Sequence, residues 1–157
     1  MENIIIKLGG NILEAKEYMI AHQCNCISTS GKGLAKLIFE KYPEADIYVN
    51  RIKIDKPGTN KIIETKGKKI INMFGQYNPG KGYGKENKTI RLMWFKSCLD
   101  LLEIKKGESI AMPYLIGCGL AGGNWKKYSE LLLRWAKEKE VKIVFYDINN
   151  ESLNQEV

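Results

Sequence analysis

Short apolar runs alternate with amphipathic segments of helical length along most of the chain. Apolar residues at 34, 35, 38, 39 and 42 have the spacing of a helix, and Pro43 ends it. The sequence predicts strands over 3–8, 20–27, 61–64, 69–74, 109–113 and 141–146, and helices over 31–42, 89–102 and from 125 onward. Since several strands are apolar throughout, the pattern predicts an α/β fold whose sheet has helices on both faces.

Local signals refine these elements. Lys66-Gly67-Lys68 separates two β-branched runs and predicts a hairpin. Asn124 is a suitable N-cap for a helix that buries Trp125, Tyr128, Leu132 and Trp135. The helix over 89–102 is expected to present Ile90, Trp94, Cys98 and Leu101 on one face. We expect a single domain over residues 1–150 and a polar tail over 151–157.

Composition excludes several classes of protein. A hydrophobic content of 44% and a charged content of 27% are typical of a globular domain. No apolar run approaches the roughly 20 residues of a membrane span, and the N-terminus does not resemble a signal peptide. We therefore expect a cytoplasmic protein, in a bacterial or virus-infected cell, with free thiols at Cys24, Cys26, Cys98 and Cys118.

The formal charge of +7 comes mostly from lysine and favours either a phosphate-bearing partner or simple solubility. Basic residues concentrate in one span, at Arg51, Lys53, Lys56, Lys61, Lys66, Lys68 and Lys69. A nucleic-acid surface would explain them, but the only nearby aromatic residue is Tyr48. A solvated face is the favoured interpretation, and nucleic acid is the less favoured partner.

Two segments share the order strand, glycine-rich turn, helix: Ser28–Leu34 (STSGKGL) and Ile116–Gly123 (IGCGLAGG). Glycine lets the backbone approach a ligand closely, and the helix start behind it offers unpaired N–H groups and a positive dipole end. Ligands of α/β sheets bind at the carboxyl ends of the strands. The sequence therefore predicts a phosphate or diphosphate site built mainly from backbone amides.

Two other glycine-loop interpretations fit poorly. Gly117, Gly119 and Gly122 spell G-x-G-x-x-G, the fingerprint of dinucleotide-binding dehydrogenases. A Rossmann domain begins with that fingerprint, whereas only one helix and one strand can follow it here. The G-x-x-x-x-G-K-[ST] pattern of nucleoside triphosphatases is absent from the sequence.

His22, Cys24 and Cys26 alternate along a strand and are predicted to share one face. The geometry argues against a common zinc ion, because His22 and Cys26 would lie about 13 Å apart along the strand. Packing against a helix is the favoured interpretation. His22 is also the only histidine, so it is a candidate for chemistry near neutral pH. Asn25 faces the other way and is predicted either to bind a sugar hydroxyl or to cap a turn.

Four blocks together resemble the macro domain: Gly9–Ile12 (GGNI), Ile20–Cys26 (IAHQCNC), Gly31–Ala35 (GKGLA) and Pro113–Trp125 (PYLIGCGLAGGNW). The resemblance covers residues 3 to about 147. It is strongest to the branch of ADP-ribose 1″-phosphate phosphatases and terminal ADP-ribose glycohydrolases. It implies a three-layer α/β/α sandwich with a mixed central sheet and an ADP-ribose cleft across the strand ends.

The resemblance also implies roles for individual residues. Gly10, Asn11, Ile12 and Tyr146 would line the adenine site, with Asn11 where most macro domains have aspartate, and Asn25 would hold the distal ribose. The first phosphate loop would comprise Gly31, Lys32, Gly33 and Leu34. The second would comprise Ile116, Gly117, Cys118, Gly119, Leu120 and Ala121. No cofactor or metal is implied, and we expect a monomer.

The resemblance implies a hydrolase that converts ADP-ribose 1″-phosphate to ADP-ribose. His22 would position water or protonate the leaving oxygen, and Asn25 would orient the distal ribose. One alternative is removal of ADP-ribose from protein or nucleic acid. The glycohydrolases do this with a lysine and an assisting aspartate, but here Ala121 occupies the aspartate position, and Gln76 and Lys81 stand near the lysine position. A further alternative is a non-catalytic ADP-ribose reader.

Overall fold

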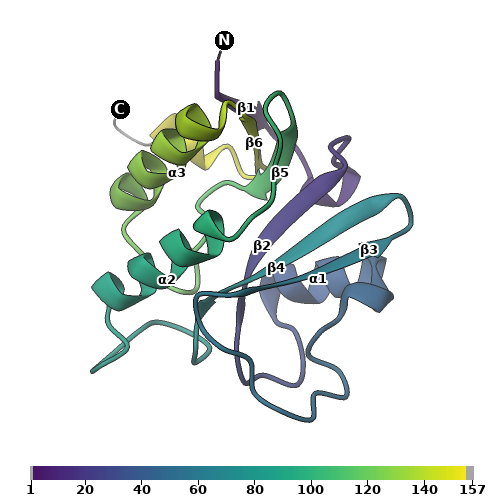
Figure 1. Cartoon of the computed structure of the whole chain (residues 1–157), viewed down its shortest axis with the longest axis vertical. Helices are drawn as coiled ribbons and strands as arrows, with labels where there is room; N and C mark the ends of the chain where they lie inside the picture. The colour runs from purple at the N-terminus through teal and green to yellow at the C-terminus, as the bar shows by residue number, and fades with distance from the viewer. Residues whose placement is uncertain (1, 155–157) are drawn as a thin grey trace.

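The computed structural model describes residues 2–154, which form a six-stranded sheet between two layers of helices (Figure 1). The strands are β1 (Ile4–Leu8), β2 (Met19–Asn25), β3 (Asn60–Thr65), β4 (Lys68–Gln76), β5 (Ser109–Pro113) and β6 (Lys142–Asp147). The α-helices are α1 (Gly33–Lys41), α2 (Lys88–Asp100) and α3 (Trp125–Lys139). Single turns of 3₁₀-helix are η1 (Ile12–Glu14), η2 (Pro43–Ala45) and η3 (Glu151–Asn154).

The sheet has the order β1-β6-β5-β2-β4-β3. All neighbouring strands are parallel except β3, which pairs antiparallel with β4. The sheet is therefore mixed, as expected. The carboxyl ends of the five parallel strands lie at one edge, and the loops that follow them gather there. Because β2 pairs directly with both β4 and β5, the loops after these three strands are neighbours.

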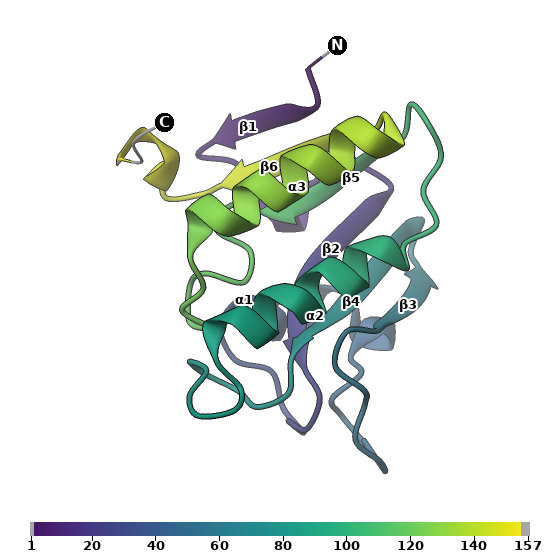
Figure 2. The same ribbon diagram turned by 60° about the vertical axis from the view of Figure 1, so that its left-hand side comes forward.

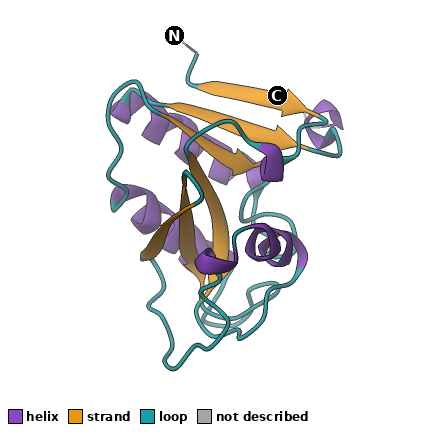
Figure 3. Cartoon of the chain, turned by 90° about the vertical axis from the view of Figure 1, so that its right-hand side faces the viewer, coloured by secondary structure: helices purple, strands orange, loops and turns teal. Residues whose placement is uncertain are grey.

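Helices cover both faces of the sheet (Figure 3), and the core has two parts, one on each face. On one face, α2 and α3 lie side by side and pack through Phe95, Leu99 and Leu132 (Figure 2). On the other face, α1 packs through Ile38 and Phe39. The expected three-layer arrangement is confirmed.

The helix starts agree with the sequence signals. The side chain of Asn124 accepts a hydrogen bond from the backbone N–H of Lys127, so Asn124 caps α3 as predicted. Of the four residues expected on its inner face, Tyr128, Leu132 and Trp135 are buried and Trp125 is half-buried.

The buried face of α2 differs from the prediction. Cys98 is buried as expected, but Leu101 is 57% exposed, and Arg91 is buried at 3% exposure together with Phe95 and Leu99. The spacing of apolar residues does not predict this buried face, because the face includes the charged residue Arg91. Its hydrogen-bond acceptors lie outside α2.

β1 is not the buried strand that its isoleucines suggest. It pairs only with β6 and forms an edge of the sheet, which leaves Ile6 and Leu8 42% and 53% exposed. The predicted hairpin is confirmed: β3 and β4 are joined at Lys66 and Gly67, which both have positive φ (50° and 72°), as type I′ turns require.

The first four residues of the predicted tail form one ordered turn. Residues 151–154 make up η3, and the carboxylate of Asp147 accepts hydrogen bonds from Glu151 N and Ser152 N. Residues 155–157 of that tail lie outside the described residues, so the predicted domain boundary stays a prediction. Among residues 2–154, no helix has the length and hydropathy needed to cross a bilayer.

Candidate functional site

The first glycine loop begins with a turn built by Asn25. Its side-chain oxygen accepts hydrogen bonds from Ile27 N at 3.1 Å and Ser28 N at 2.7 Å. This leaves the amide nitrogen of Asn25 without a hydrogen-bond partner among residues 2–154. Both sequence interpretations of Asn25 are therefore compatible: its oxygen caps a turn, and its nitrogen can donate to a ligand.

The first loop runs directly into α1. Lys32 stands at the N-cap position, but its side chain makes no capping hydrogen bond. Gly31 packs so closely on the first turn that a Cβ there would lie 2.9 Å from Lys36 N, and Gly33 has φ of +56°. The start of α1 thus offers backbone N–H groups without a side-chain acceptor, which is the arrangement that binds anions.

The second loop, between β5 and α3, is folded tightly on itself. Backbone hydrogen bonds join Cys118 N to Leu115 O, Gly122 N to Gly119 O and Gly123 N to Gly117 O. Gly117 has φ of +77°, and a Cβ there would lie 2.7 Å from the Tyr128 ring. Gly117 therefore tolerates no side chain, because Tyr128 supports the loop from below.

The outer side of this loop is open. A Cβ added to Gly119 meets no described atom within 4 Å, and Leu120 is 76% exposed. The two glycine loops also meet: a Cβ on Gly33 would stand 3.2 Å from Cδ1 of Leu120. The two glycine loops, which the sequence predicts to serve one phosphate or diphosphate site, are thus neighbours at the carboxyl edge.

The residues expected at an adenine site are brought together at the ends of β1 and β6. A Cβ on Gly10 would lie 3.0 Å from the Tyr146 ring, so the two residues are in contact. The Asn11 side chain accepts a hydrogen bond from Leu13 N and caps η1, in which Ile12 is buried. The Tyr146 hydroxyl donates a hydrogen bond to the Glu17 carboxylate at 2.5 Å. Burial, and to a smaller extent this hydrogen bond, raises the pKa of Tyr146 to about 12.

His22 lies away from these loops, in the core between the sheet and α1. Its ring is 1% exposed, packs edge-on against Phe39, and has Nε2 2.6 Å from the side-chain oxygen of Asn72. Burial lowers the pKa of His22 to about 4, although the Asn72 contact opposes this. His22 is therefore neutral at physiological pH, and its catalytic role stays a prediction.

The expected packing of the neighbouring cysteines is confirmed. Cys24 and Cys26 are buried on the same α1 face as His22, and both thiols are free. Burial raises the pKa of Cys26 to about 12 and that of Cys24 further. Within the described residues, no group of three or more His, Cys, Asp or Glu side chains is arranged to hold a metal ion.

The loop after β4, residues 77–87, borders the second glycine loop. The stem of Lys81 crosses it, with carbons 3.0 to 3.5 Å from the position of a Cβ on Gly122. Gln76, at the end of β4, accepts a hydrogen bond from Gln23 and donates one to Asn78 O. The base of the loop is held by an ion pair between Glu86 and the buried Arg91, which the sequence patterns did not reveal.

Most cations of the basic span have partners within the chain. Asp55 forms ion pairs with Arg51 and Lys61, Lys66 and Lys68 donate to backbone carbonyls, and Lys69 lies over the Tyr18 ring. For the side chains of Lys53 and Lys56, no such partner is found in the part of the chain that the structure describes. Five of the seven basic side chains thus make contacts within the chain.

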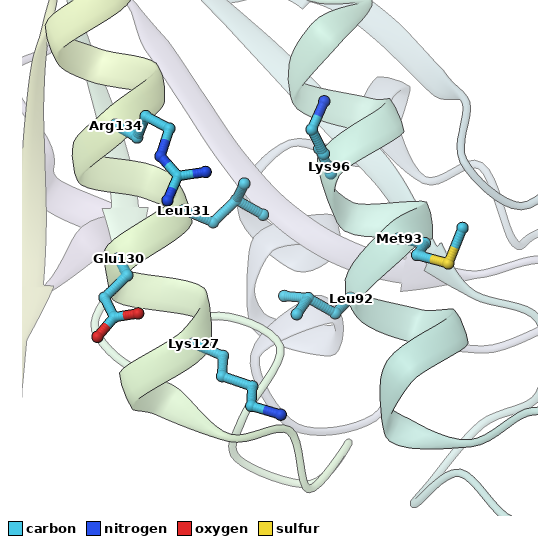
Figure 4. Close-up of a pocket in the computed structure, with 7 residues that line it drawn as sticks. All are labelled: Leu92, Met93, Lys96, Lys127, Glu130, Leu131 and Arg134. Carbon is cyan, nitrogen blue, oxygen red and sulfur yellow. The ribbon is translucent and has the colours of Figure 1, made fainter.

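A separate groove of about 270 Å³ lies between α2 and α3, away from the glycine loops (Figure 4). Its lining combines Leu92, Met93 and Leu131 with the charged residues Lys96, Lys127, Glu130 and Arg134. None of the residues predicted for ligand binding lines this groove.

Comparison with known proteins agrees with the observed architecture. The sequence model of the family described as "Macro domain" matches residues 21–132. An uncharacterised 17.5 kDa protein from the tk–vs intergenic region of Enterobacteria phage T4 is 28% identical over 141 residues, which cover 82% of this chain and 86% of that protein.

Two solved structures show the same fold. The macrodomain of Mycobacterium tuberculosis DarG superposes with a TM-score of 0.67 at 24% identity and covers 91% of this chain and 97% of that one. A Trypanosoma brucei macrodomain in complex with ADP-ribose superposes with a TM-score of 0.67 at 13% identity and covers 97% of this chain and 66% of that one.

Proposed function

The chain belongs to the macro domain family, and on that premise we propose that it binds ADP-ribose and hydrolyses ADP-ribose 1″-phosphate to ADP-ribose and phosphate. The observation that carries the proposal is the contact between the two glycine loops, Gly33 against Leu120. Two glycine loops in contact, one of them leading into a helix start without a side-chain cap, suit the two phosphates of a diphosphate better than a single phosphate. A structural relative with bound ADP-ribose supports the choice of ligand.

The proposed ligand would lie along the carboxyl edge of the sheet. The adenosine end would contact Asn11, Ile12 and Tyr146, and the diphosphate would lie between the start of α1 and the second glycine loop. The distal ribose would then come to Asn25, whose free amide nitrogen donates to a ribose hydroxyl. Backbone donors neutralise a diphosphate without charged side chains, which agrees with the absence of arginine from both loops.

In the proposed reaction, one water molecule is consumed and inorganic phosphate leaves the 1″ position. Asn25 orients the ribose, and a substrate phosphate oxygen helps to activate the water. His22 is buried and neutral, so we propose that it acts mainly by holding Asn72 and the adjoining strands β2 and β4 in register.

Calorimetry with ADP-ribose followed by a phosphate-release assay on ADP-ribose 1″-phosphate tests this function. We expect saturable 1:1 binding and release of phosphate, with ADP-ribose as a competitive inhibitor. Binding without phosphate release would contradict the phosphatase assignment and leave a reader of ADP-ribose. Absence of binding would contradict the whole proposal.

The position of Lys81 favours one second candidate, removal of ADP-ribose from a protein or nucleic acid. The Lys81 stem lies against Gly122, so its amine is tethered beside the second loop. There the neutral amine could attack C1″ of the distal ribose as the bond from C1″ to the protein or nucleic acid breaks and that macromolecule leaves with a proton, and water would then release ADP-ribose and restore the amine. The test is hydrolysis of an ADP-ribosylated peptide or oligonucleotide by the wild-type protein and by Lys81→Ala. Activity that disappears in the variant would support this candidate, and an inactive wild-type protein would contradict it.

A further inference from the structure

We propose that Arg91 is a positioning residue that holds the second glycine loop in the shape required for the diphosphate. This inference rests on the proposed function, because it concerns the same loop. Arg91 extends from the first turn of α2 and is only 3% exposed. In Figure 2, the loop that leads into α3 descends to this first turn.

Every N–H group of the Arg91 guanidinium has an acceptor. Nε donates to Glu86 at 2.8 Å, and Nη2 donates to Glu86 at 2.5 Å and to Asn78 O at 2.9 Å. Nη1 donates to Gly80 O at 2.6 Å and to Ala121 O at 3.2 Å. A guanidinium carries five N–H donors, so these five bonds saturate it.

The carbonyl acceptors come from two different loops. Asn78 and Gly80 belong to the loop after β4, whereas Ala121 belongs to the second glycine loop, 30 residues further along the chain from Arg91. The Glu86 carboxylate also accepts hydrogen bonds from Tyr77 N and Asn78 N, so it holds the start of the loop after β4 in the same network. The ion pair of Arg91 and Glu86 therefore ties the loop after β4 to the second glycine loop, which is one of the two loops proposed to hold the diphosphate.

The cost of burial argues for a geometric role. A buried ion pair contributes little net stability, because desolvation of both charges offsets their attraction, and apolar residues of similar size pack as well. The planar fork of arginine instead fixes the direction of each bonded carbonyl. Gly82 makes room for it, since a Cβ there would lie 3.1 Å from Nε of Arg91.

The bond to Ala121 falls at a sensitive place in the second loop. The residue before Ala121, Leu120, contacts Gly33 of the first loop. The residue after it, Gly122, packs against the aliphatic part of the Lys81 side chain. If Arg91 no longer holds the Ala121 carbonyl, this segment loses a hydrogen bond that fixes its backbone, and the loop can change shape. We therefore expect loss of Arg91 to weaken ligand binding although Arg91 itself touches no ligand.

The test compares Arg91→Lys with the wild-type protein and with Trp135→Phe. Lysine keeps the positive charge beside Glu86 but lacks the fork that reaches Gly80 and Ala121 together. Trp135→Phe removes a buried hydrogen bond to Leu99 O, far from the glycine loops, and serves as the control for lost stability. Two quantities are measured for each protein: the Kd for ADP-ribose by calorimetry, and amide hydrogen exchange over residues 117–123.

For Arg91→Lys we expect faster exchange over 117–123 and at least a tenfold weaker Kd, while the exchange of β2 and β5 amides stays at the wild-type rate. For Trp135→Phe, the exchange rates over 117–123 and the Kd for ADP-ribose should both stay within twofold of the wild-type values. A Kd for Arg91→Lys within twofold of wild type, or unchanged loop exchange, would overturn the inference. If Arg91→Lys does not fold, Glu86→Gln replaces it, with an expected three- to fivefold loss of affinity and the same criteria.

The two proposals fail in different ways. A wild-type protein that does not bind ADP-ribose contradicts the proposed function, yet the exchange of residues 117–123 still reports whether Arg91 braces the loop. Unchanged exchange in Arg91→Lys contradicts the brace, whatever the ligand is.

Discussion

Gly33, in the first turn of α1, lies against Leu120 in the loop before α3, with 3.2 Å between the Cβ position of Gly33 and Cδ1 of Leu120. The residues are 87 positions apart in the sequence and meet because β2 and β5, the strands that precede their loops, are neighbours in the sheet. Their contact makes the two loops one surface. The predictions below test what this surface binds and what holds it in place.

Gly119→Val is expected to weaken ADP-ribose binding strongly without harming the fold. No described atom lies within 4 Å of a Cβ at Gly119, and its φ lies outside the left-handed region. The side chain would occupy the open space in front of the loop, where the proposed diphosphate lies. We expect a Tm within about 3 °C of wild type and an affinity reduced at least about tenfold. Gly119→Ala should show a smaller loss, and equal affinity for all three proteins would contradict the diphosphate cradle.

Asn25→Asp separates the two uses of this side chain. Aspartate keeps an oxygen that accepts from Ile27 N and Ser28 N, but it has no amide donor for a ribose hydroxyl. We expect near-native stability, a kcat for phosphate release lower by about 100-fold, and a smaller change in KM. Asn25→Ala should lose the turn as well and melt at a lower temperature. Equal losses in binding and turnover for both variants would make Asn25 a binding residue only.

The lowered pKa of His22 is expected to make the stability of the protein depend on pH. The pKa of His22 is about 4 in the folded protein and 6.5 in its usual environment, so between these values the unfolded chain binds a proton that the folded chain does not. The free energy of unfolding should therefore fall as the pH falls below 6.5, by about 2 kcal/mol between pH 7 and pH 5 from this group alone. Urea unfolding of the wild type and of His22→Gln at several pH values isolates the contribution of His22, because the carboxylates titrate in both proteins. Parallel curves for the two proteins would contradict a buried neutral histidine.

Gly67→Ala tests the hairpin apart from the site. Gly67 has φ of +72° with no described atom within 4 Å of its Cβ position, so the only expected penalty is backbone strain. We expect a loss of about 1 kcal/mol in the free energy of unfolding by urea denaturation, and a smaller loss for Gly67→Asn. ADP-ribose affinity should not change, because this turn lies at the amino end of β4. A change in affinity would show that the hairpin and the cleft are coupled.

The sequence was sufficient for features that depend on neighbouring residues. Apolar spacing, Pro43 and the Asn124 cap located α1 and α3, and Lys66-Gly67 located the hairpin, because these signals act within one or two turns of backbone. The two strand–glycine turn–helix units were recognised for the same reason. The shared face of His22, Cys24 and Cys26 followed from strand alternation alone.

Only the tertiary structure decided which of these local units meet. The order of strands in the sheet depends on long-range packing, so the contact of Gly33 with Leu120 and the edge position of β1 cannot be derived from local patterns. The burial of Arg91 was missed because its acceptors, the Glu86 carboxylate and the Ala121 carbonyl among them, come from different loops. A charged residue is buried only where other segments supply its partners, and that supply exists only once the chain has folded.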